Sequence, residues 1–85
     1  MNPQSTKFKV LAAVIDHYEV KAYGPTVDEL ADEVGLNGRS TVQFHINDLR
    51  DQHLLTNLPN RPRTLRATEK GEKLVELMRG HGSSN

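Results

Sequence analysis

The chain has 85 residues, 35% of them hydrophobic, with no cysteine and with 11 basic residues balancing 11 acidic ones. This length predicts one small domain, and the lack of cysteine excludes a disulfide framework, a thiolate metal site and a cysteine nucleophile. The uncharged run from Val10 to Ile15 is too short for a signal peptide or a membrane span. We therefore expect a cytoplasmic protein without membrane association.

Charge is unevenly distributed along the chain. Four acids lie within residues 28–33, which leaves seven acids against eleven bases elsewhere, and residues 52–68 contain three arginines and no acid. The neutral total argues against nucleic acid as a partner, but the segregation is compatible with a local phosphate-binding face. The acidic run is most simply a solvated helix face, with a metal or a basic partner protein as the alternative.

Apolar spacing predicts a first helix over residues 5–22, with Ser5 as its N-cap. Val10 and Val14 lie on a second side of this helix, where they broaden the core face or contact a later element or a second subunit. The predicted buried stripe consists of Phe8, Leu11, Ile15, Tyr18 and Ala22.

A second helix is predicted over residues 27–34. The segment Tyr23-Gly24-Pro25 breaks the first helix, and Thr26 and Glu29 together form a capping box. Gly35 ends the second helix.

A third helix is predicted over residues 39–52, because Val42, Ile46 and Leu49 recur at helical spacing after a glycine-containing turn. Two short helices joined in this way indicate a helix-turn-helix. His45 lies at the edge of the core. The outward arc of the third helix carries Ser40, Phe44, Asn47 and Asp51, flanked by Thr41, Gln43 and Asp48.

A hairpin and a last helix complete the order of elements. Residues 54–58 and 64–67 are short strand candidates, and the loop 59–63 contains two prolines and two arginines. Thr68 is placed to cap a final helix over residues 69–79.

This order predicts a mainly α fold with a small β-hairpin. It is a winged helix-turn-helix with a three-helix core, a two-stranded wing over residues 54–67 and an additional C-terminal helix. We expect a single domain over residues 1–79 and a disordered tail over residues 80–85.

Three segments of the chain have a family resemblance. They are residues 23–31, with Pro25-Thr26 and Glu29-Leu30-Ala31; Ser40-Thr41-Val42 with His45-Ile46 and Leu49; and Arg63-Thr64-Leu65-Arg66. They resemble the amino-terminal DNA-binding domain of the LexA repressor family, including its recognition helix and the second strand of its wing. The similarity covers about residues 6–67 and implies DNA binding and repression.

The chain departs from that family at three positions. Ala22 and His53 stand where the family usually has glycine, and Gly24 where it usually has a proline. A left-handed residue at the end of the third helix is easiest for glycine, so the entry into the first wing strand is expected to differ. The segment Thr68-Glu69-Lys70-Gly71 is also similar to the residues after the wing in MarR-type regulators.

LexA-like repressors carry a second domain in which a Ser/Lys pair performs self-cleavage. The resemblance in this chain stops before any such domain. We therefore expect release from DNA to come from another signal, from competition or from loss of a partner.

A DNA-bound winged helix places its third helix in the major groove, where Gln bonds adenine, Ser and Thr bond several base edges and an apolar ring contacts a thymine methyl. Arginines on the wing and at the helix start reach phosphates or the minor groove. The predicted DNA-binding residues are Arg39, Ser40, Thr41, Gln43, Phe44, Asn47, Arg61 and Arg63. The alternative for Phe44 is packing under the wing or in a dimer contact. Ser5 and Lys7 either touch phosphate or have only local roles, in helix capping and as solvated side chains.

One recognition helix offers too few contacts for specific binding, so a homodimer on a palindrome is expected. The predicted interface is the last helix through Leu74, Leu77 and Met78, with Val10 and Val14 as an extension. The alternative is that this helix only covers the core of its own domain.

The sequence contains no catalytic constellation. Its four histidines lack the spacing of metal ligands and are most simply surface or core-edge residues. We predict no enzymatic activity, no cofactor and no metal.

The predicted function is sequence-specific binding of double-stranded DNA by a small transcriptional repressor, nucleoid-associated when bound. The alternative is a winged-helix interaction module or accessory factor, in which the acidic second helix and Phe44 contact a protein.

Overall fold

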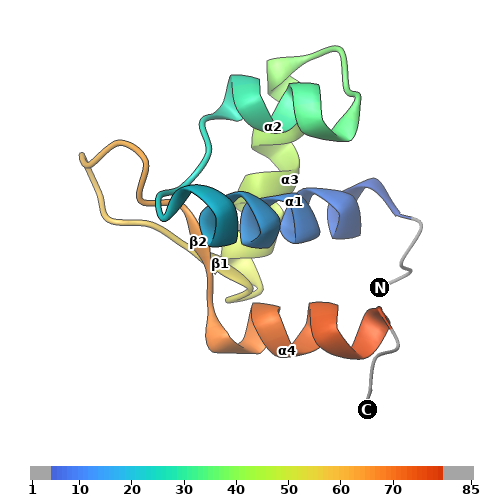
Figure 1. Cartoon of the computed structure of the whole chain (residues 1–85). Coiled ribbons are helices and arrows are strands. Elements are labelled where there is room, and N and C mark those ends of the chain that lie inside the picture. The colour runs from blue at the N-terminus through green and yellow to red at the C-terminus, as the bar shows by residue number, and fades with distance from the viewer. Residues whose placement is uncertain (1–4, 80–85) are drawn as a thin grey trace.

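A computed structural model describes residues 5–79 of the chain. Within these residues lie four helices, α1 (Thr6–Lys21), α2 (Val27–Val34), α3 (Arg39–Asp51) and α4 (Glu69–Met78), and two strands, β1 (Leu55–Thr56) and β2 (Arg66–Ala67). Figure 1 shows α1 across the centre, with α2 on one side of it and α4 on the other. The predicted fold class, a mainly helical winged helix-turn-helix, is confirmed. The predicted tail over residues 80–85 lies outside the described residues.

The core forms around α1, which packs against α2, α3, α4 and β2. Val10 and Val14 are completely buried. They therefore broaden the core face of α1 and are not available to a second subunit. The largest of the fully buried side chains are Leu11, Leu30, Leu49, Val10, Val14 and Val42.

The predicted buried stripe of α1 is wrong at its carboxyl end. Phe8 and Leu11 are buried, but Ile15 and Tyr18 are half-buried and Ala22 is exposed. The physical reason is local, because Ala22 lies beyond the helix as its C-cap and lines an open cleft beside the hairpin.

The helix starts depend on the side chains that the sequence indicates. The Ser5 hydroxyl accepts a hydrogen bond from the Phe8 amide, and Thr26 and Glu29 form both bonds of a capping box. The Thr68 hydroxyl accepts from the Gly71 amide at the start of α4. These bonds satisfy amides that have no partner inside their helices.

We call residues 54–67 the wing, and its strands are shorter than predicted. Its ladder pairs only Leu55 with Ala67 and Thr56 with Arg66. The candidate strands 54–58 and 64–67 are therefore too long. Asn60 and Arg63 interrupt the extended backbone, since both adopt left-handed φ values of 60° and 61°.

The side chain of Thr64 joins the wing where the ladder stops. Its hydroxyl accepts a hydrogen bond from the Leu58 amide at 2.9 Å and lies 2.9 Å from the Arg61 carbonyl oxygen, to which it can donate. A side chain thus replaces the backbone pairing that two prolines and two left-handed residues prevent.

Two glycines let the wing approach its neighbours closely. The Gly24 amide donates to the Arg63 carbonyl at 2.9 Å, and a Cβ atom on Gly24 would lie 2.2 Å from the Leu65 carbonyl oxygen. A Cβ atom on Gly71 of α4 would lie equally close to the Leu54 carbonyl oxygen, at 2.2 Å. Real Cβ atoms do not approach backbone so closely, so both positions require glycine.

At the two positions where the family usually has glycine, the backbone of this chain adopts the left-handed conformation that glycine favours. Ala22 and His53 have φ values of 65° and 62°, in the left-handed region. The Ala22 amide donates to the Tyr18 carbonyl at 2.8 Å, and the His53 amide donates to the Arg50 carbonyl at 2.9 Å. Each residue ends its helix as a glycine would, at a steric cost of about 1 kcal/mol.

Candidate nucleic-acid interface

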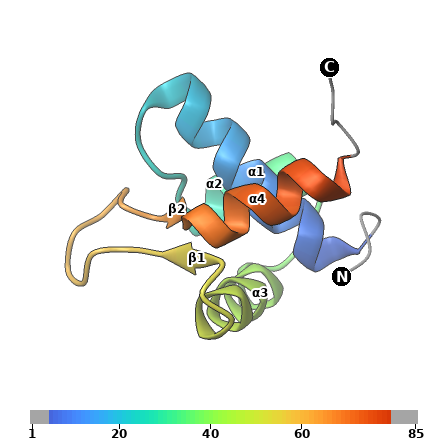
Figure 2. The same cartoon turned by 90° about the horizontal axis from the view of Figure 1, so that it is seen from below.

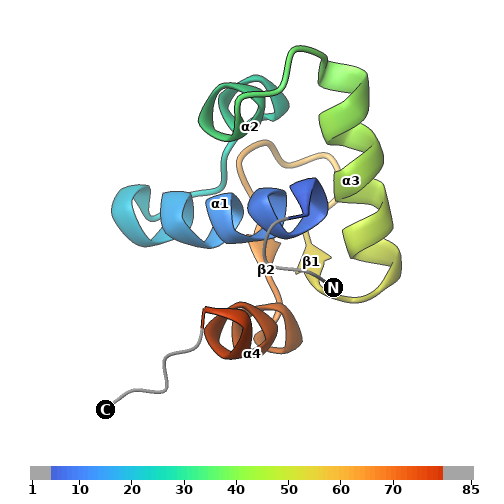
Figure 3. The same ribbon diagram turned by 90° about the vertical axis from the view of Figure 1, so that its right-hand side faces the viewer.

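The exposed face of α3 is set by its buried face. Val42, Ile46 and Leu49 are inside the core, and α3 runs along one edge of the molecule in Figure 3. Phe44 is 65% exposed, so its predicted alternative of packing under the wing is wrong for this chain. The exposed side chains of α3 that the sequence singles out are Arg39, Ser40, Thr41, Gln43, Phe44, Asn47 and Asp51.

A chain of hydrogen bonds leads from α3 to the wing. The Gln43 amide nitrogen donates to the Asn47 side-chain oxygen at 3.0 Å. Arg50 donates to that same oxygen at 2.7 Å and to the Asn57 side-chain oxygen of the wing at 2.8 Å. Neither Arg50 nor Asn57 was predicted from the sequence. The position of Arg50, three residues after Asn47 on a helix, is a signal that could have found it.

A groove of about 270 Å³ lies between the start of α2, α3 and the wing. It brings together Gln43, Arg61 and Arg63 of the predicted set, with Arg50 and Asn57 beside them. Arg39, Ser40, Thr41, Phe44 and Asn47 do not line it. In Figure 2 the wing projects to one side of the molecule, with α3 next to its base.

Arg63 of the wing is tied back to α2. It donates two hydrogen bonds to the Glu29 carboxylate, at 3.0 and 3.2 Å, and its guanidinium lies 4.9 Å from the Tyr23 ring centre. The bond from Arg63 and the bond from the Thr26 amide lower the pKa of Glu29 from 4.5 to about 2. The same pairing raises the pKa of Arg63.

Arg39 is also paired with an acid of α2. Its Nε lies 2.9 Å from an Asp28 carboxylate oxygen, and both side chains are about 70% exposed. Exposed ion pairs contribute only about 0–1 kcal/mol, so the Arg39–Asp28 pair adds little to stability.

Asp48 of α3 is paired as well. Lys7 of α1 forms an ion pair with Asp48, and this hydrogen bond, followed by one from Gln52, lowers the pKa of Asp48. Within the described residues Lys7 therefore binds an acid of α3, and Ser5 caps α1. Asp48 is held toward α1 rather than toward the exposed face of α3.

His17 is a buried residue, which corrects its assignment to the surface or core edge. Its Nδ1 lies 3.0 Å from a Glu33 carboxylate oxygen, and its Nε2 lies 3.8 Å from Glu29. The acidic run of α2 is thus not a uniformly solvated face, because Glu29 and Glu33 bind partners from α1 and the wing. Among residues 5–79, no group of three His, Asp or Glu side chains is arranged to hold a metal ion.

The apolar patch predicted on α4 is mostly used inside the domain. Leu74 and Met78 are half-buried and pack against the core, while Leu77 is 77% exposed. In the part of the chain that is described, no helix is long and apolar enough to span a bilayer.

The helix-turn-helix of α2 and α3, with a basic wing beside α3, defines a winged-helix domain of the DNA-binding class. Residues 4–64 match the family described as LexA DNA binding domain, and the chain belongs to this family. The resemblance to the LexA family that the sequence indicated is thereby confirmed.

Curated relatives support the same assignment. The chain is 37% identical over 68 residues to the LexA repressor of Oenococcus oeni, an alignment that covers 80% of the chain and 32% of the relative. It is 38% identical over 68 residues to the LexA repressor of Limosilactobacillus reuteri, covering 80% and 33%. With the LexA repressor of Lacticaseibacillus casei it shares 34% identity over 74 residues, covering 87% and 35%. The chain spans about a third of the length of these relatives.

Proposed function

We propose that this protein is a transcriptional repressor that binds double-stranded DNA in a sequence-specific manner. The observation that carries the proposal is the groove where Gln43 of α3 meets Arg61 and Arg63 of the wing. One surface thereby combines a donor and acceptor for base edges with cations for phosphates. Membership of the LexA DNA-binding family and similarity to LexA repressors support the same function.

In the proposed complex α3 lies in the major groove. Gln43 and Asn47 contact base edges, Ser40 and Thr41 bond bases or phosphates at the helix start, and Phe44 packs on a thymine methyl. Arg39 contacts phosphate beside the amino end of α3.

The wing contributes the second part of the proposed contact. Arg61 and Arg63 bind phosphates or enter the minor groove, and Arg63 exchanges Glu29 for phosphate when it does so. Arg50 holds Asn47 and Asn57 in place and so links the base-contacting helix to the wing. The protein acts as a cytoplasmic factor that joins the nucleoid when bound to DNA.

A homodimer on a palindromic site completes the proposal. A single recognition helix gives too few base contacts for the roughly 4–10 kcal/mol by which specific binding exceeds non-specific binding. Leu77 is the exposed part of the proposed dimer surface on α4, with Leu74 and Met78 at its edge.

Fluorescence anisotropy tests the proposal. The protein is titrated into a random duplex pool and into duplexes selected from that pool, at about 50 and 200 mM salt. We expect Arg61→Ala to weaken binding to all duplexes and to reduce the salt dependence of binding by about one counterion. Gln43→Ala should weaken binding to the selected duplexes by about 1–3 kcal/mol and should change binding to random duplexes little. Lys73→Ala, an exposed change on α4, serves as the control.

Two results would overturn this assignment. Binding that is absent at low salt, or insensitive to salt, excludes the phosphate contacts. An equal loss for all sequences in Gln43→Ala removes the base-contact role of Gln43.

A protein-interaction module is the second candidate function. It is favoured by Phe44, an aromatic side chain of α3 that is 65% exposed. In that case Phe44→Ala abolishes binding to a partner protein, whereas Arg61→Ala does not affect it.

A further inference from the structure

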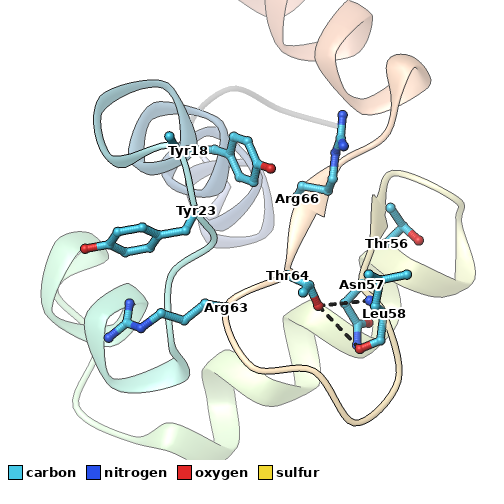
Figure 4. A pocket seen from close by; sticks show the side chains of 9 residues that line it. Tyr18, Tyr23, Thr56, Asn57, Leu58, Arg63, Thr64 and Arg66 are labelled. Atoms are coloured by element: carbon cyan, nitrogen blue, oxygen red, sulfur yellow. Dashed lines mark hydrogen bonds between the residues drawn. The ribbon is translucent and has the colours of Figure 1, made fainter.

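A second cleft lies between the wing and the carboxyl end of α1, with a volume of about 360 Å³. Asn57, Arg63 and Thr64 line both this cleft and the groove beside α3, so the wing separates the two. Figure 4 shows Tyr18 and Arg66 facing each other at one end, and the wing residues Thr56, Asn57, Leu58 and Thr64 along another side. Its volume falls in the range of small-molecule sites.

The walls of this cleft combine aromatic, apolar and cationic groups. The Arg66 guanidinium lies 5.5 Å from the centre of the Tyr18 ring. Leu58 is 57% exposed and supplies an apolar surface on the wing. Thr56 and Asn57 of the wing add polar groups to the lining.

The charge of the cleft is positive. Arg63 is neutralised by Glu29, but among residues 5–79 Arg66 forms no ion pair with an acid. No carboxylate of the described residues lines the cleft. Glu19 and Glu72 line a neighbouring cavity with Tyr18 and Arg66, but no ion pair joins either of them to Arg66 in the described residues. A guanidinium without an ion-pair partner beside an aromatic ring is complementary to a planar anion, because the guanidinium binds a carboxylate bidentately while rings stack on Tyr.

We propose that this cleft is a binding site for a small planar carboxylate, such as an aromatic acid, whose occupancy weakens DNA binding. The carboxylate binds Arg66, and the ring lies between Tyr18 and Leu58. A small molecule is favoured over a strand of DNA because the cleft faces the end of α1 and not the exposed face of α3.

The coupling to DNA rests on the proposed function and follows from the shared wall. An anion in the cleft attracts Arg63 and neutralises Arg66, both of which belong to the wing. The wing then presents less positive charge to phosphates. Such coupling between two sites typically changes affinity about fivefold or more.

A nuclear magnetic resonance titration of the full chain, without DNA, tests the site. The probe is sodium 2-naphthoate, and the comparison ligands are neutral 2-naphthamide and inorganic phosphate at matched ionic strength. We expect saturable shifts of the Tyr23, Thr56 and Thr64 amides with 2-naphthoate. Arg66→Gln should weaken this binding about tenfold or more, as for loss of a charge-assisted hydrogen bond, and Lys73→Gln should not.

Three outcomes would overturn the site. They are equal binding of the neutral amide, equal binding of inorganic phosphate, which would assign Arg66 to phosphate alone, and unchanged affinity in Arg66→Gln.

DNA anisotropy with and without saturating 2-naphthoate tests the coupling. We expect about fivefold weaker DNA binding with the ligand in the unmodified protein, and no further weakening by the ligand in Arg66→Gln. Unchanged DNA affinity overturns the coupling alone. Absence of DNA binding before ligand is added is a failure of the proposed function, and the titration without DNA does not depend on it.

Discussion

The helix α3 and the wing form the two halves of the proposed DNA surface, and they are held in different ways. Three apolar residues of α3 enter the core and thereby turn its polar residues outward. The wing has a ladder of two residue pairs and depends on the Thr64 hydroxyl, the close approach at Gly24 and the Glu29–Arg63 ion pair. The proposed base-contacting half is thus fixed by its own periodicity, whereas the proposed phosphate-contacting half depends on contacts from α2 and from the loop before it.

Gly24→Ala should disrupt the attachment of the wing and have the largest effect on stability. The added Cβ would lie 2.2 Å from the Leu65 carbonyl oxygen, so the wing must move away. We expect a loss of about 3 kcal/mol in the free energy of unfolding, measured by urea denaturation. Gly38→Ala, at the N-cap of α3, is the control: its nearest atom would be 3.8 Å away, and alanine at an N-cap costs only about 1 kcal/mol. A loss below about 1 kcal/mol in Gly24→Ala would contradict the close packing.

Thr64→Val tests the side chain that joins the wing beyond its ladder. Because the Leu58 amide loses its acceptor, we expect a loss of about 1–2 kcal/mol and faster hydrogen exchange at that amide. Amides in the middle of α3 should keep their protection. Thr56→Val, at an exposed strand position, should change stability by less than about 0.5 kcal/mol. Equal effects of the two changes would count against the role of Thr64.

Ala22→Gly tests the left-handed residue that ends α1. Ala22 adopts a left-handed φ of 65°, which glycine tolerates better, so the change should stabilise the protein by about 0.5–1 kcal/mol. Ala13→Gly, inside the same helix, should destabilise it by about 1 kcal/mol. Thermal unfolding of both variants measures the two effects, and the same sign for both would refute the interpretation.

Glu29→Gln probes the electrostatic part of the wing attachment and should have the smallest effect. The folded pKa of Glu29, about 2, is below its ordinary value of 4.5. Its contribution to stability is therefore complete above about pH 4.5 and is lost as the pH falls toward 2. We expect a shallower decline of the melting temperature from about pH 5 to 3 in Glu29→Gln than in the unmodified protein. Asp32→Asn, a nearby exposed acid, should leave the decline unchanged.

The helical part of the fold could be predicted because its signals are local. Apolar spacing and capping side chains such as Ser5, Thr26 and Thr68 act within a few residues. The limits of the wing strands and the burial of His17 could not be predicted in this way. They depend on left-handed residues, a threonine side chain and acids that lie far away in sequence.

The candidate site, like the fold, could be predicted only in part. The outward residues of α3 follow from helix geometry, so Gln43 and Phe44 could be placed on the exposed face from the sequence. The helical spacing of Arg50 after Asn47 was an available signal, but Asn57 could not be found in this way, because its bond to Arg50 joins the wing to α3. The pairing of Arg39 and Arg63 with acids of α2 is likewise absent from the sequence pattern.

The sequence by itself determined the order of the helices, the hairpin and the family, because short-range periodicity and capping residues encode them directly. Only the tertiary structure decided which charges are free and which are paired, which valines are buried, and where the wing creates a groove and a cleft. These properties depend on distances between residues that are remote in the chain, and the spacing of residue types does not contain those distances.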